Sequence, residues 1–374
     1  MIPHHAVAGR LSLQYGPVYN DGMRKVLKIA VLSAALLLLA VALYLGYMTA
    51  TDFRPEAVTD LEIENNTAVI LEKGVPFSLL TFNIGYGGMD AGADFFMDGG
   101  RGSRSRSLGQ TRANLQGIAA CLAAAKADLV LLQEVDLKAT RSYHLNERSE
   151  LEAGLSGYGS SFAVNYKVPW VPVPLRRPMG AVHSGLLTFS RLRVGAALRR
   201  QLPGSEAWPR QLAELDRCLG ECRLPVQGGR ELVLINLHLS VFDRGGKIRR
   251  QQLTYLRQRL LEEYRNGNYV IAGGDWNHGL PGSSPGRFKK TMRQPDWYMA
   301  LPSDFTPPGF IWALDPSRPT IRASRTAYRP LQSFVAIIDG FLVSPNVEVR
   351  SATVRDLGFI HSDHNPVLAV MILK

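Results

Sequence analysis

The longest unbroken apolar stretch of this chain lies near its N-terminus. Residues 29–47 carry no charge and are rich in Leu, Ala and Val, and as a helix they are long enough to cross a hydrocarbon core of about 30 Å. Arg24, Lys25 and Lys28 precede the stretch, and Asp52 follows it. Because basic residues favour the cytoplasmic side, the pattern predicts one membrane-spanning helix with the remainder of the chain outside the cytoplasm.

Two alternatives apply to this N-terminal region. A cleaved signal peptide also has a basic segment followed by an apolar one, but the only small-residue exit, at residues 48–50, is a poor cleavage site and the apolar run exceeds the usual length. We therefore favour a retained anchor. Met23 is an equally good start, which would leave residues 1–22 as a leader, and nothing in those residues indicates a fold.

Beyond the anchor, short apolar runs alternate with helical patterns. Residues 109–126 carry Leu115, Ile118 and Leu122 on one helical face, and residues 248–264 repeat such a face. This alternation predicts an α/β fold. Strand-like runs cover residues 77–82, 129–132, 232–239, 269–272, 336–343 and 367–373.

The composition favours one large folded domain after the anchor. The chain has 374 residues with 46% hydrophobic and 20% charged content, which allows a sizeable core and gives no signature of disorder. A stretch at 302–330, rich in Pro, Ser and Arg, reads as a long surface excursion. The predicted organisation is a cytoplasmic segment at 1–28, a transmembrane helix at 29–47, a linker with the start of the domain at 48–75, and the folded domain at 76–374.

Charge and cysteine content say little about the class of substrate. The formal net charge of +11 suits any polyanion, including nucleic acid, anionic lipid headgroups and cell-envelope polymers. Cys121 falls in an apolar helical segment and is expected to be a core thiol. Cys218 and Cys222 share a loop-like stretch where a local disulfide is one expectation, whereas a structural zinc site lacks the second ligand pair that it needs.

Candidate chemistry lies at the ends of the strand-like runs. A polar residue that ends a strand lies at the rim of its sheet, where α/β proteins form their sites. Each motif found there is weak alone, but all of them in sequence are hard to obtain by chance, and together they predict one metal-assisted phosphoester site. The motifs are Thr81-Phe82-Asn83, Gln133-Glu134-Val135-Asp136, Asn236-Leu237-His238-Leu239, Gly274-Asp275-Trp276-Asn277, Ile338-Asp339-Gly340 and Ser362-Asp363-His364-Asn365-Pro366-Val367.

The residue types suggest a metal and a water-activating group. Glu134 and Asn83 offer the oxygen ligands that Mg²⁺ prefers, and a substrate phosphate with water would complete the coordination. Asp275 is expected to align or deprotonate the attacking water, and Asn277 to hold a phosphate oxygen. The cofactor prediction is therefore Mg²⁺, with Mn²⁺ as a substitute.

The two histidines of the motifs are candidates for stabilising negative charge. His238 and His364 are expected to donate hydrogen bonds to the charge that develops on the phosphate. A neighbouring carboxylate would keep one imidazole protonated, because an adjacent negative charge raises the pKa of histidine. Asp339 and Asp363 are the candidates for this carboxylate.

Together these six motifs resemble those of the endonuclease/exonuclease/phosphatase superfamily. This superfamily has the deoxyribonuclease I-like fold and includes abasic-site endonucleases, neutral sphingomyelinases and inositol-polyphosphate phosphatases. The resemblance covers roughly residues 77–373. It implies a four-layer α/β sandwich of two packed mixed β-sheets flanked by helices, and divalent-metal hydrolysis of phosphoesters. Carried over by motif, it implies Glu134 and Asn83 at the metal, Asp363 as a second metal-side carboxylate, Asp275 and Asn277 as the paired Asp and Asn, His238 at the phosphate, His364 as the catalytic histidine and Asp339 as its partner.

Departures from the family patterns narrow the subfamily. Gly85 stands where abasic-site endonucleases usually carry an acidic residue, and His278-Gly279 replaces the aromatic-Arg pair expected of inositol-polyphosphate phosphatases. Two peripheral segments are candidates for contributing to substrate choice. The glycine-rich residues 85–107 are expected to be a mobile surface loop, and residues 166–177 a packed loop, although each has a chemistry suited to phosphate, lipid or bases. Arg141 and Tyr143 are candidate substrate-binding residues.

The sequence therefore predicts a magnesium-dependent phosphodiesterase or nuclease, held at the cell membrane by one span with its catalytic domain on the extracytoplasmic side. A sphingomyelinase-like hydrolase of phospholipid headgroups is the alternative within enzymes. A catalytically silent scaffold that binds a phosphorylated ligand is the alternative outside them. The predicted partners are a phosphodiester substrate, either nucleic acid or phospholipid headgroup, and the membrane, and no protein partner is identifiable from the sequence.

Overall fold

The computed structural model describes residues 21–374 and divides into two compact units, one ending at Ala50 and the other formed by Thr51–Lys374. The first 20 residues of the predicted cytoplasmic segment lie outside the described part. In the first unit, α1 (Asp21–Ala50) covers the predicted span and exposes its apolar side chains along most of its length. By length and composition α1 can cross a membrane, and it is the one such helix among residues 21–374.

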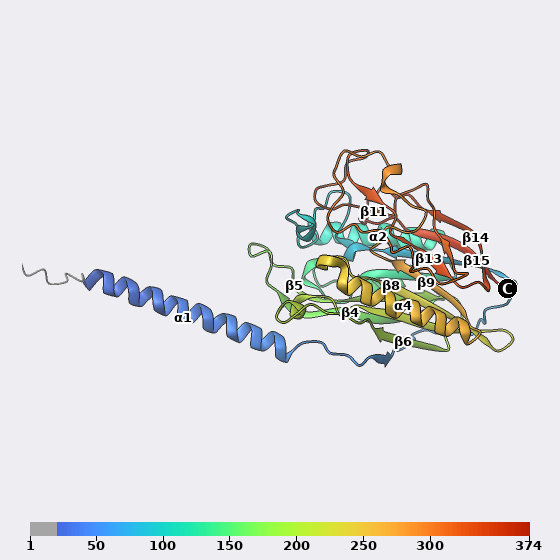
Figure 1. Ribbon diagram of the computed structural model, residues 1–374, viewed down its shortest axis with the longest axis horizontal. Coiled ribbons are helices and arrows are strands. Elements are labelled where there is room, and N and C mark those ends of the chain that lie inside the picture. Colours follow the sequence, from blue (N-terminus) through green and yellow to red (C-terminus); the bar gives the residue numbers. More distant parts are fainter. Residues whose placement is uncertain (1–20) are drawn as a thin grey trace, which may run out of the picture. The chain divides into compact units, whose positions relative to one another are not determined.

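Two mixed β-sheets build the second unit (Figure 1). In each sheet, one parallel pair lies among antiparallel neighbours, namely β2 with β3 and β8 with β9. The first sheet has the spatial order β1 (Val58–Asp60), β6 (Ala196–Gln201), β7 (Cys218–Val226), β8 (Arg230–His238), β9 (Tyr269–Asp275), β13 (Asp339–Val343) and β10 (Ile311–Ala313). The second has the order β14 (Val347–Val354), β15 (Val367–Leu373), β2 (Pro76–Asn83), β3 (Leu129–Asp136), β5 (Gly180–Ser190) and β4 (Gly159–Val171).

Smaller elements complete the domain. The strands β11 (Ile321–Arg322) and β12 (Val335–Ala336) form a separate two-stranded sheet. The α-helices are α2 (Leu108–Ala125), α3 (Glu147–Glu152) and α4 (Lys247–Arg265). Short 3₁₀ helices are η1 (Gly85–Gly87), η2 (Phe96–Asp98), η3 (Thr140–Ser142), η4 (Arg210–Ala213), η5 (Arg244–Gly246) and η6 (Pro285–Arg287).

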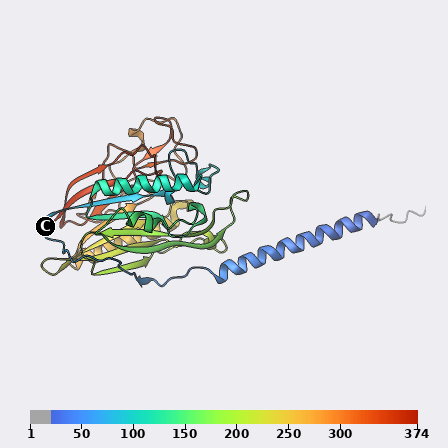
Figure 2. The same ribbon diagram turned by 180° about the vertical axis from the view of Figure 1, so that it is seen from behind.

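Alternating side chains of the strands create three apolar layers. Leu79 and Leu131 face the other sheet and pack with Leu234 and Phe341 in one buried cluster, because successive residues of a strand point to opposite faces. The outer faces carry their own clusters, one under α2 and one under α4. Figure 1 shows α4 in front of the sheets, and Figure 2 shows α2 in front when the domain is seen from behind. The prediction of a four-layer α/β sandwich is therefore confirmed.

All members of these three clusters belong to the unit Thr51–Lys374. Each layer is closed by residues of the same unit, with Leu253, Leu256 and Leu260 of α4 on one outer face and Ile118 and Leu122 of α2 on the other. A chain that buries three such layers within itself has the core that independent folding requires. We therefore treat residues 51–374 as a domain that folds on its own.

Three local expectations differ from the structure. Residues 166–177 are not a packed loop, because their first part belongs to β4 and Val173, Leu175, Arg176 and Arg177 are exposed. The stretch 302–330 is not simply a surface excursion, because β10 extends the first sheet and β11 pairs with β12 beside the site. Residues 85–107 form a loop that is held in place: Arg322 is buried and donates to the carbonyl oxygens of Met89, Asp90 and Ala93. An exposed mobile loop was expected from glycine content, but a buried guanidinium needs these acceptors and thereby fixes the loop.

The local disulfide between Cys218 and Cys222, which the sequence left open, does not form in this structure. Both residues lie in β7, four positions apart in one extended strand, and both thiols are free and buried. At about 3.4 Å per residue the two Cα atoms are about 14 Å apart, well beyond disulfide range. The stretch resembles a loop in sequence because Gly, Cys, Arg and Pro interrupt its apolar pattern.

Candidate active site

The strand register of the first sheet brings three motif residues side by side. His238 ends β8 and is paired with Asp275, the last residue of β9. Asp275 is paired in turn with Asp339, the first residue of β13. Gly274 permits this arrangement, since it has φ of 144° and a Cβ atom there would lie 2.0 Å from the carbonyl oxygen of Leu237. One edge of the sheet therefore carries the His238 imidazole beside two neighbouring carboxylates, with Asp275 in the middle.

The second sheet contributes residues to the same edge. Asn83 ends β2 beside Gln133 of β3, so that Glu134 follows at the rim. Gln133 donates a hydrogen bond of 2.8 Å to Asn236 of β8, which ties the two sheets together directly below the rim. The loop before β15 returns to this edge as well, where the Ser362 hydroxyl donates to the Asn83 carbonyl oxygen at 2.8 Å.

Asp275 is the centre of the cluster. Its Oδ2 accepts from Asn83 Nδ2 at 3.1 Å and lies 3.4 Å from His238 Nε2 and 3.7 Å from His364 Nε2. Its Oδ1 accepts the backbone N–H of Asn277 at 2.9 Å. Burial, together with the charge of Asp339, raises the pKa of Asp275 to about 7 against the opposing charge of His364. Asp275 is therefore a stronger base than an ordinary aspartate.

His364 is held by a carboxylate on one side and faces the cluster on the other. Its Nδ1 lies 2.9 Å from Asp339 Oδ2. Burial alone would lower the pKa of His364, but the charges of Asp339 and Asp275 outweigh it and raise that pKa to about 10. The imidazole is thus cationic at neutral pH, with Nε2 directed at Asp275. Asp339 Oδ1 is buried and has no hydrogen-bond partner.

His238 has the opposite electrostatic setting. It is buried, and burial together with the charge of Arg217 holds its pKa well below the usual range, so that the ring is neutral. Its Nε2 faces Asp275, while its buried Nδ1 has no partner. A neutral ring has only one N–H, which limits the hydrogen bonds that His238 can donate.

The predicted metal residues Asn83, Glu134 and Asp363 lie together, but the side-chain oxygen of Asn83 is turned away from Glu134. Its Nδ2 donates to Glu134 Oε1 at 3.2 Å and to Asp275, and its Oδ1 accepts from the Gly85 N–H at 3.0 Å. Coordination by the oxygen would require the amide to rotate. Glu134 has φ of 56° at a register shift of β3, and its side chain is 25% exposed. Burial and the charge of Glu134 raise the pKa of Asp363 to about 6.

A divalent cation fits this set of donors. Glu134 and Asp363 repel each other, as the raised pKa of Asp363 indicates, and a cation between like charges would relieve that repulsion. Both offer carboxylate oxygens, which hard cations prefer. Asp275, Asp339 and His364 also bring ligand atoms within 4.8 Å of one another. In that second group, however, His364 Nδ1 and Asp339 Oδ2 already bind each other.

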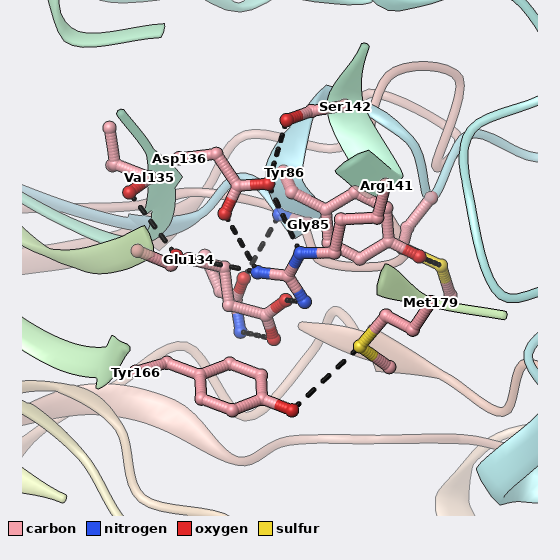
Figure 3. A network of polar contacts seen from close by, with 12 residues as sticks. Gly85, Tyr86, Glu134, Val135, Asp136, Arg141, Ser142, Tyr166 and Met179 are labelled. Carbon is pink, nitrogen blue, oxygen red and sulfur yellow. Dashed lines mark hydrogen bonds and ion pairs between the residues drawn. The ribbon is translucent and has the colours of Figure 1, made fainter. Parts of the chain in front are cut away.

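Arg141 lies beside the centre but is committed to Asp136 (Figure 3). Its Nε and Nη2 donate to the two Asp136 oxygens at 3.1 and 2.9 Å, and its guanidinium lies 4.0 Å from the centre of the Tyr86 ring. Arg141 is 5% exposed, and its Nη1 lies 3.8 Å from Glu134 Oε2. The tight, buried pair with Asp136 argues against the predicted substrate contact.

Tyr143 and Asn277 use polar atoms within the protein. The Tyr143 hydroxyl donates to the backbone at Ser105 and Arg106, and accepts from Arg177 Nη2 at 3.2 Å. Among residues 21–374, no hydrogen bond joins Tyr143 to the central cluster. Asn277 is buried beside Asp275, and its Nδ2 donates to Leu239 O at 2.7 Å. One of its two amide hydrogens is thus engaged.

Sequence reasoning missed Arg217 and Thr320. Arg217 is 9% exposed and donates from Nη1 to the His238 carbonyl oxygen at 3.1 Å, and its charge acts on Asp275 and Glu134. Thr320 Oγ1 accepts the N–H groups of Ile338 and Asp339. Neither residue belongs to a motif at a strand end. Only the fold reveals their place, so no local signal was available.

Comparisons with known proteins agree with this geometry. A sequence profile described as the Endonuclease/Exonuclease/phosphatase family matches residues 80–364. No curated protein matches the chain. Similar solved structures include an endonuclease/exonuclease/phosphatase from Beutenbergia cavernae DSM 12333, at a TM-score of 0.53 and 17% identity over 80% of this chain and 72% of that one.

Two further structures show the same relationship. Truncated TDP2 from Caenorhabditis elegans has a TM-score of 0.50 and 16% identity over 80% of this chain and 99% of that chain. A protein of this family from Leptotrichia buccalis C-1013-b has a TM-score of 0.50 and 13% identity over 78% and 98% of the two chains. At these identities the likeness concerns the fold.

Proposed function

Because the chain belongs to the Endonuclease/Exonuclease/phosphatase family, we propose that it is a membrane-anchored, divalent-metal-dependent phosphodiesterase acting on the extracytoplasmic side of the membrane. The family supports phosphoester hydrolysis in general, and the finer statement rests on the site. The observation that carries it is the contact between cationic His364 and Asp339, directed at the base Asp275. A ligand-binding scaffold has no need of this pairing of acid and base.

The metal belongs on the side of Glu134 and Asp363. Members of this family generally use a divalent metal, and these two carboxylates, with Asn83 after rotation of its amide, would hold Mg²⁺ or Mn²⁺. When bound, such an ion polarises a phosphoryl oxygen and stabilises charge in the transition state. Asn83 Nδ2 also donates to both Glu134 and Asp275, and so links the carboxylate of the metal side to the proposed base.

The remaining residues supply proton transfer and charge stabilisation. Asp275 Oδ2 would accept the proton of the attacking water, which its pKa of about 7 favours. His364 would donate the Nε2 proton to negative charge on the phosphate, and Asp339 stabilises that cation. The second amide hydrogen of Asn277 would donate to a phosphate oxygen, and the buried Arg217 would add positive charge beside Asp275. Neutral His238 orients Asp275 through Nε2.

Hydrolysis of bis-p-nitrophenyl phosphate by residues 51–374 with Mg²⁺ tests this proposal. We expect metal-dependent turnover, a loss of about 10²–10⁴-fold in kcat for His364→Ala, and a higher requirement for metal in Glu134→Gln. His183→Ala is the matched control, because among residues 21–374 no hydrogen bond or ion pair joins this half-buried histidine of β5 to Asp275 or His364, so turnover should stay unchanged. Unchanged rates in both site variants would refute the site assignment.

The same assay extends to substrate class and to the scaffold alternative. Plasmid DNA, RNA and sphingomyelin, assayed in parallel, distinguish a nuclease from a hydrolase of phospholipid headgroups. Failure to hydrolyse any of them, by protein that still binds a phosphorylated ligand, would favour the silent scaffold. A sphingomyelinase-like activity is the second candidate, because the exposed apolar side chains of Trp170, Val173 and Leu175 lie at the edge of the domain that carries the site.

A further inference from the structure

The β4–β5 hairpin projects from the edge of the domain that carries the site. Asp136 of β3 pairs with Ser184 of β5, and β5 continues beyond this position to Gly180, which pairs with Val171. The connection at residues 172–179 therefore extends past the rim where Glu134 lies. In Figures 1 and 2 the hairpin lies on the side of the domain away from the C-terminus.

The hairpin tip, residues 170–177, has an unusual surface. Leu175 is 87% exposed, more than any other large apolar side chain of the described residues, and Val173 and Trp170 are 44% and 41% exposed. Arg176 and Arg177 are exposed next to them. Exposed apolar and aromatic side chains beside cations are the composition of protein segments that enter the headgroup region of a bilayer.

The base of the hairpin is fixed to the rest of the domain. Arg104 Nε donates to the Pro178 carbonyl oxygen at 2.6 Å, and Ser103 Oγ donates to the Arg177 carbonyl oxygen. Arg177 Nη2 donates to Ser105 O at 3.0 Å and to the Tyr143 hydroxyl. These contacts hold the tip in a constant relation to the site, so that a surface bound by the tip would meet the same edge of the sheets.

The chain also enters the domain at this edge. Val58 starts β1 opposite Arg200 of β6, and Gln201 N donates to Ala57 O. Gln201 in turn pairs with Cys218, the first residue of β7, which lies at the end of the sheet where β8 reaches His238. Lys167 and Arg199 lie over the Phe53 ring at 5.2 and 5.6 Å.

Only Thr51 and Asp52 separate Phe53 from the last residue of α1. Because each residue spans at most about 3.6 Å, a bilayer crossed by α1 begins within a short chain length of this edge. The chain entry and the apolar tip therefore lie at the same edge of the domain, and the short connection allows that edge to reach the bilayer.

We propose that the hairpin tip docks on the anionic surface of the bilayer that α1 spans, so that the catalytic edge faces phosphodiesters of that surface. The inference rests on the proposed membrane-anchored phosphodiesterase and specifies where its substrate lies. Leu175, Val173 and Trp170 would enter the headgroup region, and Arg176 would pair with anionic lipid. Water-soluble phosphodiesters would still reach the site without the tip.

Fluorescence quenching tests the docking without relying on activity. The full chain, with Leu175→Cys in a Cys121→Ser background, is labelled with bimane and reconstituted in vesicles of phosphatidylcholine and phosphatidylserine that contain doxyl-labelled lipid. Gln227→Cys is the matched control, since this exposed residue lies in the β7–β8 turn at the opposite edge. We expect several-fold stronger quenching at position 175 than at 227. Equal quenching at the two positions would overturn the proposal.

A kinetic comparison separates failure of docking from failure of the proposed activity. In the full chain, Val173→Asp with Leu175→Asp should lower kcat/KM about 10-fold on a phosphodiester lipid in vesicles, while hydrolysis of soluble bis-p-nitrophenyl phosphate stays unchanged. Val69→Asp, also an exposed apolar residue but beside Arg193 at the opposite edge, should change neither.

The outcomes are distinguishable. Absence of turnover on bis-p-nitrophenyl phosphate by the unmodified chain would refute the phosphodiesterase, whereas quenching at position 175 would still support docking. Equal rates of the tip variant and the unmodified chain on vesicles would overturn docking alone. Loss of DNA cleavage in the tip variant, with no quenching at position 175, would assign the tip to nucleic acid and also overturn it.

Discussion

Arg141 shows how one buried ion pair decides the role of a residue near the site. Its guanidinium makes two parallel hydrogen bonds to Asp136, and the Ser142 hydroxyl donates to the same carboxylate at 2.8 Å. Below them, buried Glu147 accepts the Asp136 N–H, and burial with the charge of Asp136 raises the pKa of Glu147. A carboxylate as enclosed as Asp136 requires a cation, so Arg141 is needed where it is.

Removing this cation should destabilise the domain. Arg141→Met leaves Asp136 buried without its partner, and the free energy of unfolding of residues 51–374 should fall by about 3–5 kcal/mol. Urea denaturation measures the change. Arg191→Met is the control, because Arg191 is half exposed and lies 3.8 Å from Asp128, and its loss should cost less than about 1 kcal/mol. Unchanged stability with a raised KM in Arg141→Met would instead support the substrate-binding role expected from the sequence.

Among the elements, the short β11 strand connects two parts of the site that are distant in sequence. Arg322 N donates to Asp363 O, and Asn365 N donates to Thr320 O, so the segment holds the loop of His364. The hydroxyl of Thr320 accepts the N–H of Asp339 at 3.1 Å and that of Ile338 at 2.9 Å. The pairing of His364 with Asp339 therefore depends on this one segment.

Loss of the Thr320 hydroxyl should loosen that pairing. Thr320→Val keeps the shape but leaves two buried N–H groups without an acceptor, which should cost about 1–3 kcal/mol for each group. A small displacement of Asp339 should lower kcat about 10–100-fold. Thr320→Ser retains the hydroxyl and should keep most of the activity. Equal rates in the Val and Ser variants would show that the hydroxyl does not position Asp339.

The strand elements also explain what the sequence could predict. Asn83, Glu134, His238 and Asp275 were found because each stands at the end of an apolar run, and the register of two parallel pairs brings such ends to one edge. The strands from β4 to β7 were missed. β7 packs between two strands although Gly220 and Arg223 interrupt its apolar pattern, which shows tertiary pairing overriding local propensity.

The side-chain pairings at the site could not be predicted from the sequence for the same reason. The commitment of Arg141 to Asp136 was hidden, because five positions separate the two residues and only the turn of η3 brings them together. The roles of Thr320 and Arg217 depend on packing between elements, as does the orientation of the Asn83 amide. Periodicity identifies which side chains reach the rim, and it does not state which of them bind each other there.

For the whole molecule, charge and anchoring bear on the same question. The net charge of +11 attracts polyanions of every kind, so it does not separate nucleic acid from an anionic membrane. The apolar surface of α1 is the more selective feature, because a helix whose Leu36, Leu37 and Leu38 are all well exposed is stable in lipid and poorly soluble in water. Under the proposed anchoring, a membrane surface is the polyanion that the domain meets first.

The proposed anchoring predicts how the protein behaves on membrane fractionation. The full chain should remain in the membrane fraction after an alkaline carbonate wash, and residues 51–374 alone should be released. Since Arg24, Lys25 and Lys28 precede the span, protease added outside intact cells should degrade the domain and spare the N-terminal end.

Mass spectrometry of the membrane-bound protein distinguishes anchor from signal peptide. A retained anchor gives a chain that still contains α1, and the tethered domain is then confined to substrates within reach of Phe53. A mature N-terminus near Thr51, with release by carbonate, would show that α1 is a cleaved signal. In that case the hairpin tip would have to hold the domain at the membrane without any covalent help, and a few exposed apolar side chains give only weak, reversible binding. The substrate would then be sought in solution.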